Sequence, residues 1–209
     1  MRIGIIGAAT VGQVLAKHFA NAGHDVLIAN SRGPESLKDL AMRLGPHVAA
    51  GHVADAVGCA VVFLAVPWIR VYEVLTPDLD WGGRVLVDAT NIFKTYAPSF
   101  EVDRLGDDSG SEIVARRAPA ARVVKAFNTL SIEKMFAPAR ANGLRRVLFV
   151  AGDDADAVSV VEQLIEDIHL QPVVIGSLAT GGRLMQLGGP LSGLELLSTS
   201  NPKKRTKNE

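Results

Sequence analysis

Short runs of apolar residues alternate along the chain with segments in which apolar residues recur at helical spacing. This alternation is typical of an α/β fold with a mainly parallel sheet. Several runs are continuous stretches of Val, Ile, Leu and Phe, as expected for strands covered on both faces. The runs predict strands at Ile3–Ile6, Val26–Ala29, Val48–Ala50, Val61–Val66, Val85–Asp88, Val123–Phe127, Val147–Ala151 and Val173–Ile175.

Two segments have the apolar stripe of a helix. The first lies between the first two predicted strands and stops before Gly23, where a left-handed cap is favoured. The second runs from about Asp154 to Asp167, with Asp153 or Asp154 as its N-cap. The polar stretch Pro98–Ser111 predicts a loop, which leads to a short helix near Glu112–Arg117.

The order of these elements predicts a Rossmann-type doubly wound parallel sheet with a small C-terminal α/β domain. A cluster of alanine and proline near Ala120–Arg122 suggests the boundary, so that residues 1–122 form the first domain and 123–200 the second. Residues 201–209 are basic and predict a disordered, solvated tail.

Composition restricts the kind of ligand. The 209 residues carry 22 basic and 22 acidic side chains, so no overall field favours nucleic acid or an anionic membrane. Cys59 is the only cysteine and the five histidines are scattered, so we expect neither a disulfide nor a metal site. Since the sequence shows neither a signal peptide nor an apolar run of membrane-spanning length, we expect a cytoplasmic protein.

The turn after the first strand has the pattern of a dinucleotide-binding motif. In GAATVG, Gly7 permits a tight turn and Gly12 lets the following helix approach the strand, so that helix amides point at a pyrophosphate. Ala9 stands where the usual motif has its middle glycine. Taken alone, these six residues are equally compatible with a strand-to-helix turn that binds nothing.

The end of the second strand distinguishes between these alternatives. Domains that prefer NAD place an acidic residue there, about twenty positions after the glycines. This chain instead has Asn30, Ser31 and Arg32, and a guanidinium with a neighbouring hydroxyl suits the ribose phosphate of NADP. These residues could also simply start a helix at Gly33 and Pro34, and both interpretations can hold together.

The nicotinamide half of such a cofactor would lie beyond the fourth and fifth strands. Ala65, Val66 and Pro67 follow one of them, Thr90 and Asn91 follow the other, and small apolar side chains leave room for a flat ring. Trp68 could wall this pocket, although packing at a helix start is the favoured interpretation.

Together, the blocks IGIIG, AGHDVLIANSR, VFLAVP, VDATN, VVKAFNTL, VAGDDADA and GGRLMQLGGPL resemble the coenzyme F420-dependent NADP oxidoreductase family. The resemblance runs from Arg2 to about Leu197. It implies that hydride passes between NADP and a deazaflavin coenzyme, F420, stacked on the nicotinamide between two domains.

The resemblance also implies roles for particular residues. Thr10 and Val11 match the pyrophosphate turn, while Ser31 and Arg32 match the phosphate clamp. The segment Ala126–Thr129 matches the one beside the two reacting rings, and Leu187–Leu191 matches the element that lines the second site. Second-coenzyme contacts are thereby assigned to Asn128, Thr129, Gly189 and Leu191.

The second coenzyme remains open between F420 and a flavin, because F420-dependent members tend to have histidine at the position of Asn128. The segment AFNT also resembles the NADPH domains of flavin-using metalloreductases.

Hydride transfer between two rings needs proximity and exclusion of water rather than a catalytic acid, base or metal. Two alternatives are a non-catalytic NADP(H)-binding redox sensor and a reductase of a small metabolite. The reductase would need a proton donor, and Lys125 is the residue closest in sequence, although a structural role is favoured for it. Apolar residues of a predicted C-terminal helix could cover the small domain or join two copies in a homodimer: Leu191, Leu194, Leu196 and Leu197.

Overall fold

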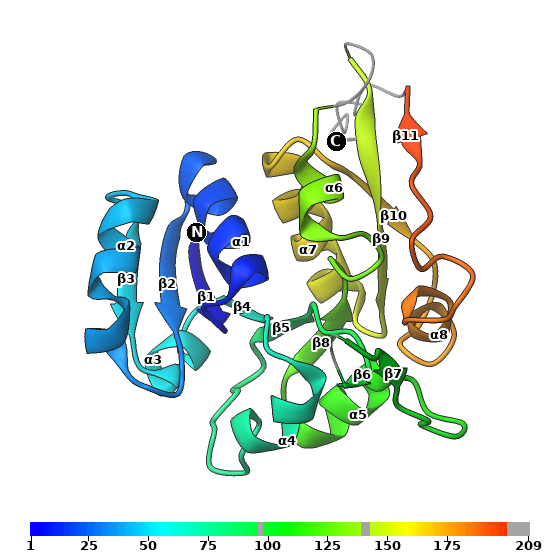
Figure 1. Cartoon of the computed structure of the whole chain (residues 1–209), viewed down its shortest axis with the longest axis horizontal. Coiled ribbons are helices and arrows are strands. Elements are labelled where there is room, and N and C mark those ends of the chain that lie inside the picture. Colours follow the sequence, from blue (N-terminus) through cyan, green and yellow to red (C-terminus); the bar gives the residue numbers. More distant parts are fainter. Residues whose placement is uncertain (96–97, 139–142, 200–209) are drawn as a thin grey trace, which may run out of the picture.

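The computed structural model describes residues 1–95, 98–138 and 143–199. Within these ranges nine strands form one sheet, in the order β10-β9-β8-β5-β4-β1-β2-β3, with β11 paired to β9 (Figure 1). Each of the eight predicted strands is present, with ends within two residues of those expected. The strands of the sheet are β1 (Arg2–Ile6), β2 (Asp25–Ala29), β3 (Val48–Gly51), β4 (Val61–Leu64), β5 (Val85–Asp88), β8 (Arg122–Lys125), β9 (Arg145–Gly152), β10 (Gln171–Val174) and β11 (Leu197–Ser198).

The predicted doubly wound parallel sheet is confirmed. The strands from β3 to β8 pair only in parallel along the order β3-β2-β1-β4-β5-β8, which is the Rossmann arrangement. Beyond it, β9 pairs antiparallel with β8 through Val124 and Lys125, and β10 runs parallel to β9. The domain boundary at residue 122 stays a prediction, and the tail 201–209 lies outside the described residues.

Helices cover both faces of the sheet because successive strand side chains point in opposite directions. Ile3, Ile5 and Phe63 share one buried cluster with residues of α1 (Thr10–Asn21), α2 (Lys38–Leu44), α6 (Ile132–Phe136) and α7 (Ala155–Asp167). Ile6, Leu27 and Leu64 share another with residues of α3 (Val53–Val57), α4 (Val71–Val74) and α5 (Gly110–Arg117). Met185 of α8 (Gly181–Met185) packs on β9.

The two long helices, α1 and α7, have the caps that the sequence predicts. Gly23, just after α1, has a φ of +87°, and the side chain of Asp154 accepts the amide of Ala157 at the start of α7. Of the helices in the described ranges, none is both long enough and apolar enough to cross a bilayer.

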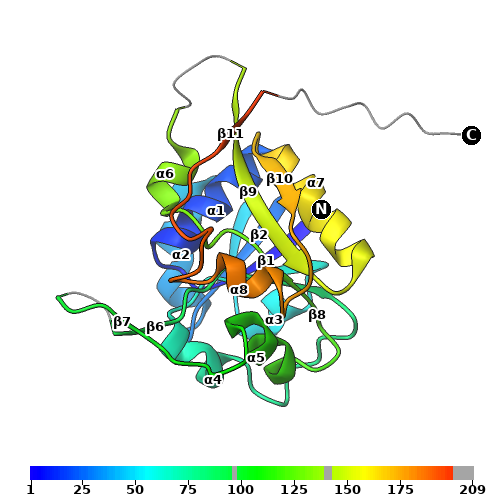
Figure 2. The same cartoon turned by 90° about the vertical axis from the view of Figure 1, so that its right-hand side faces the viewer.

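Two expectations were wrong in part. The stretch 98–111 contains, besides loop, the start of α5 and the strand β7 (Glu101–Val102), which pairs with β6 (Phe93–Thr95) in a hairpin at the side of the protein (Figure 2). The predicted C-terminal helix is absent from residues 191–198, which form turns and β11 instead. Leu194, Leu196 and Leu197 are exposed there, and the homodimer stays a prediction.

Gly12 determines how closely α1 approaches β1. A Cβ atom at this position would lie 1.8 Å from the carbonyl oxygen of Gly7, far inside contact distance. Gly7 itself has a φ of +117°, and its own Cβ would lie 2.2 Å from the carbonyl oxygen of Ala65. Both glycines are therefore required by the turn that joins β1 to α1.

We expect Gly12→Ala to lower the free energy of unfolding by at least about 2 kcal/mol, because α1 must move away from β1. Gly58→Ala is the matched control, since Gly58 has a helical φ of −68° and its Cβ would come no closer than 3.3 Å to another residue. Urea denaturation of both variants gives the comparison. Equal losses would show that the close approach at Gly12 is unimportant.

Candidate cofactor site

The predicted cofactor residues gather at the carboxyl ends of β1, β2, β4 and β5. β1 pairs with β2 on one side and with β4 on the other, so the order of the strands along the sheet reverses at β1. At such a reversal the connections that follow neighbouring strands pass to opposite faces of the sheet and leave a crevice between them. Two adjacent pockets open there. They share Val66 and Pro67, which follow β4.

The turn from β1 to α1 presents backbone amides to this crevice. Gln13 is the first residue whose amide bonds back along α1, to the carbonyl of Ala9, so the amides of Thr10, Val11 and Gly12 lack acceptors within the helix. The Gln13 side chain donates to the carbonyl of Ala8 at 2.8 Å and fixes the turn. Because the first turn of α1 contains no acidic residue, its positive end is available to an anion.

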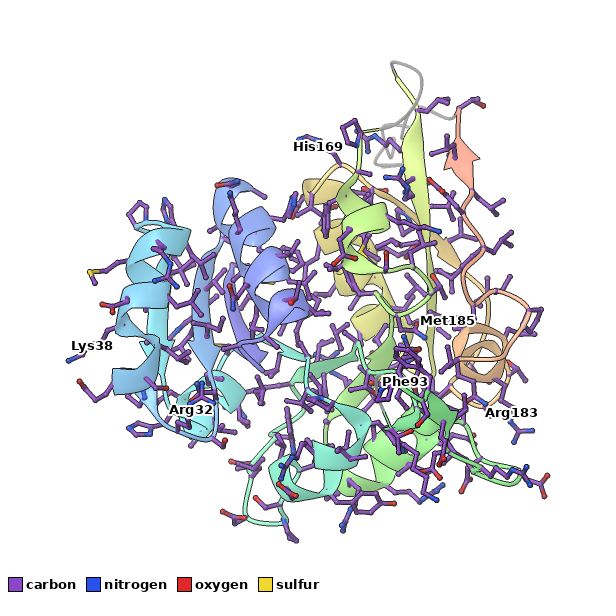
Figure 3. The ribbon with its side chains drawn as sticks, viewed as in Figure 1. Arg32, Lys38, Phe93, His169, Arg183 and Met185 are labelled. Carbon is purple, nitrogen blue, oxygen red and sulfur yellow. The ribbon has the colours of Figure 1, made fainter. Side chains whose placement is uncertain are left out.

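The larger pocket, of about 610 Å³, lies at the end of β2 and is lined by Asn30, Ser31 and Arg32. Asn30 organises this end, since its Oδ1 accepts the amide of Arg32 at 2.8 Å and its Nδ2 donates to Ser36 at 3.0 Å. Arg32 extends from the same end of the sheet (Figure 3). A 3₁₀ helix, Pro34–Leu37, follows directly, so the helix-start interpretation of this segment also holds.

The smaller pocket, of about 260 Å³, lies beyond β4 and β5. Its lining brings together residues predicted at the pyrophosphate turn, residues predicted beside the nicotinamide, and two residues that sequence analysis missed, Ala89 and Phe93. The lining residues are Ala9, Thr10, Val11, Ala65, Val66, Pro67, Ala89, Thr90, Asn91 and Phe93. The position of Phe93 depends on the β6–β7 hairpin, for which the sequence pattern gave no indication. None of these ten residues is ionisable.

Trp68 has the structural role that was favoured for it. It begins the 3₁₀ helix Trp68–Arg70, is 4% exposed and donates its indole N–H to Asp103 at 2.9 Å.

A buried polar network lies beneath the smaller pocket. Nζ of Lys125 donates to Asp88 at 3.0 Å and to the carbonyl of Thr90 at 2.5 Å. Asp88 also accepts the amide and hydroxyl of Thr90 and the hydroxyl of Ser111, at 2.9, 2.6 and 2.7 Å. The network holds the backbone of Thr90 in place, and Thr90 and Asn91 line the pocket. Lys125 therefore has the structural role favoured for it.

Burial shifts the pKa values of Asp88 and Lys125 in one direction, and their charges and hydrogen bonds shift them in the other. Burial raises the pKa of Asp88, but the charge of Lys125 and the hydrogen bonds from Thr90 and Ser111 outweigh burial and lower it below its usual value. Burial lowers the pKa of Lys125, although Asp88 opposes this effect. The carboxylate of Asp88, kept ionised by its other donors, favours the protonated form of Lys125, and the amine donates to Asp88 and to Thr90 within the network.

Replacing Lys125 with Met leaves Asp88 buried without its counter-charge, and we expect a loss of about 3 to 5 kcal/mol in stability at pH 7. In the wild type, the lowered pKa of Asp88 contributes stability that is present above its unfolded pKa of about 3.9 and lost below it. In Lys125→Met the first of the effects that oppose burial is lost, so the pKa of Asp88 rises relative to the wild type and the difference in stability between the two proteins shrinks as the pH falls.

Urea unfolding at pH 7 and pH 5 measures this effect, with Lys134→Met on the exposed side of α6 as control. We expect the difference in free energy of unfolding between the wild type and Lys125→Met to be smaller at pH 5. A difference that is the same at both pH values would exclude an effect of Lys125 on the pKa of Asp88.

The segment predicted beside the reacting rings directly follows β8. Phe127 is buried and has a φ of +65°, which is rare for a bulky side chain and turns the chain sharply. Asn128, 4% exposed, donates from Nδ2 to Oδ1 of Asn91 at 3.2 Å and to the carbonyl of Met185 at 2.9 Å. Asn91 donates back to the carbonyl of Asn128 at 2.9 Å, and Oδ1 of Asn128 is buried without a partner among the described residues.

The C-terminal element packs against this segment. The amide of Gly193 donates to the carbonyl of Thr129 at 2.7 Å, and the amide of Leu191 donates to Leu184 at 3.0 Å. Gly189 lies so close to α8 that a Cβ there would lie 2.4 Å from the carbonyl oxygen of Arg183. Within the described chain, neither pocket is lined by Ala126, Asn128, Thr129, Gly189 or Leu191, so their contacts with a coenzyme stay a prediction.

Comparisons with known proteins agree with this geometry. Residues 2–92 match the model of the family described as NADP oxidoreductase coenzyme F420-dependent. The crystal structure of SMa0349 from Sinorhizobium meliloti is 42% identical, with a TM-score of 0.85, over 95% of this chain and 96% of that one. A candidate F420-dependent NADP reductase from Arthrobacter sp. FB24 is 29% identical, with a TM-score of 0.70, over 87% of each chain.

Two further similarities cover only part of the other protein. The metalloreductase STEAP3 of Rattus norvegicus is 30% identical over 181 residues, which make up 86% of this chain and 34% of that protein. The chain thus spans about a third of the length of this relative. An imine reductase from Aspergillus terreus, 19% identical with a TM-score of 0.63 over 90% of this chain and 59% of that one, shows the fold alone.

The fold and the crevice are those of dinucleotide-binding dehydrogenases and reductases. Residues 2–92 match the NADP oxidoreductase coenzyme F420-dependent family, as the sequence resemblance implied, and the similar proteins with a described activity are reductases.

Proposed function

We propose that the protein transfers hydride between NADP(H) and a flavin or deazaflavin coenzyme whose ring lies against the nicotinamide. The observation that carries this proposal is the smaller pocket, in which no lining residue is ionisable. Reduction of an imine or carbonyl in a small metabolite normally needs a nearby proton donor. Hydride transfer between two stacked rings instead needs alignment and a site that excludes water.

The residues of the two pockets fit an NADP molecule along its length. The amides of Thr10, Val11 and Gly12 hold the pyrophosphate, while Ser31 and Arg32 hold the adenosine phosphate. When bound, NADPH supplies the hydride, and the proton that completes reduction of the second ring comes from water. Pro67 and Asn91 orient the nicotinamide from two sides of the smaller pocket.

Asn128 is proposed to hold the second ring. Its Oδ1 is a buried acceptor without a partner in the described structure, whereas both Nδ2 protons have acceptors. Leaving such an oxygen unpaired costs about 1 to 3 kcal/mol, so an N–H donor from a bound ring would be stabilising. Both deazaflavin and flavin rings offer such a donor. The likeness to a metalloreductase supports the flavin, and the family supports F420.

The direct test is oxidation of NADPH with F420, FMN or FAD as the acceptor. Turnover with at least one of these coenzymes is expected, and the preferred one identifies the physiological ring. NADPH binding without turnover on any of them would leave a non-catalytic NADP-binding protein and contradict hydride transfer.

Arg32→Ala should cost about 1.5 to 3 kcal/mol of NADPH affinity, because a charge-assisted contact with the adenosine phosphate is lost. The affinity for NADH should change little. Fluorescence titration with both cofactors gives the two values. Arg43→Ala is the control, since Arg43 is exposed near the end of α2 and lines neither pocket. A similar loss for NADPH and NADH would remove the argument for a phosphate clamp.

Asn128→Leu should slow hydride transfer to the second coenzyme about 10- to 100-fold, because the acceptor ring is no longer aligned. NADPH affinity should stay close to that of the wild type. Stopped-flow single turnovers separate these two effects, with Asn21→Leu at the exposed end of α1 as control. Weaker NADPH binding with unchanged transfer would instead place Asn128 at the nicotinamide.

A further inference from the structure

The larger pocket has a second charged wall, opposite the end of β2. Arg70 closes the 3₁₀ helix Trp68–Arg70, and Glu73 lies one turn later in α4. Both residues line the pocket with Arg32. A single Nη1 atom of Arg70 donates to both carboxylate oxygens of Glu73, at 2.8 and 2.7 Å. In Figure 1, α4 and the end of β2 lie toward the same end of the protein.

Glu73 is the single carboxylate among the described residues that line this pocket. Rossmann proteins that prefer NAD use an acidic residue in the adenosine site, where it accepts ribose hydroxyls and leaves no room for a phosphate. A carboxylate in this pocket would therefore oppose NADP unless its charge were neutralised. Its ion-pair partner Arg70 supplies the neutralising charge.

We propose that Arg70 is a specificity-determining residue, which makes the pocket selective for NADP by neutralising Glu73 rather than by gripping the phosphate itself. This inference rests on the NADP site proposed above. Arg32 and Arg70 give two positive charges and Glu73 one negative charge, so the lining carries a net charge of one positive unit. A net positive lining favours the adenosine phosphate over an uncharged ribose hydroxyl.

The effect must be moderate, because the side chains of Arg70 and Glu73 are 58% and 62% exposed and water screens them. Two unit charges about 4 Å apart in water interact by about one kcal/mol, which corresponds to about a fivefold change in affinity. The effect should also fall as salt is added, since the screening length shortens from about 10 Å at 0.1 M to about 3 Å at 1 M.

The experiment measures dissociation constants for NADPH and NADH in the wild type, Arg70→Ala, Glu73→Gln and the double variant, at low salt and at 0.5 M salt. Arg70→Ala brings the net charge of the lining to zero and should weaken NADPH binding about three- to fivefold, with less than about a twofold change in NADH binding. Glu73→Gln should bind NADPH at least as tightly as the wild type. The double variant restores the original net charge and should return to within about twofold of the wild type.

The double variant decides between neutralisation and direct contact. If Arg70 gripped the phosphate itself, removing Glu73 as well would not restore affinity, and a double variant as weak as Arg70→Ala would overturn the proposal. Equal effects of Arg70→Ala on NADPH and NADH would overturn it too. Arg116→Ala is the matched control, because Arg116 forms a comparably exposed ion pair with Asp108 and lines neither pocket. A wild type indifferent to NADPH would refute the proposed function instead.

Discussion

The approach of α1 to β1 constrains the rest of the site. The helix lies so close to the strand that Gly12 cannot have a side chain, and Gly7 must turn with a positive φ. This geometry brings the first amides of α1 to the crevice between β1 and β4. Those amides have no acceptors within the helix, so the fold itself creates an anion site at the centre of the sheet. The two pockets lie on either side of it and share Val66 and Pro67.

Charge is distributed unequally between the two pockets. The larger pocket, which we propose to hold the adenosine phosphate, contains the charged residues Arg32, Arg70 and Glu73. The smaller pocket, which we propose to hold the nicotinamide, is lined by apolar and neutral polar residues, and Lys125 and Asp88 form a buried ion pair behind Thr90. In the proposed function, selectivity for the phosphate and hydride transfer are therefore separated in space. The charged end of the cofactor meets charged residues, and its reactive end meets a pocket whose lining contains no ionisable residue.

Much of the N-terminal half could be predicted from the sequence because its determinants are local. Continuous Val, Ile and Leu runs mark buried strands, and Gly7, Gly12 and Gly23 mark turns and caps whose geometry needs no distant partner. The absence of a carboxylate at Asn30–Arg32 is likewise visible in the chain itself.

What sequence reasoning missed depends on contacts between distant segments. Asp88 and Lys125 are 37 positions apart, and their pairing follows only from the parallel register of β5 and β8. Phe93 reaches the pocket through a short hairpin without an alternating pattern. The leucines after Gly193 suggested a helix, but the amide of Gly193 is bound to Thr129, and Leu197 pairs with β9. Tertiary contacts overrode local propensity in this segment.

We propose that one NADP molecule spans both pockets across the first turn of α1, and a crystal structure of the protein with NADP⁺ would decide this. We expect the pyrophosphate at the amides of Val11 and Gly12, the adenosine phosphate at Ser31 and Arg32, and the nicotinamide between Pro67 and Asn91. A cofactor bound away from the start of α1, or with its adenosine phosphate turned away from Arg32, would refute this binding mode.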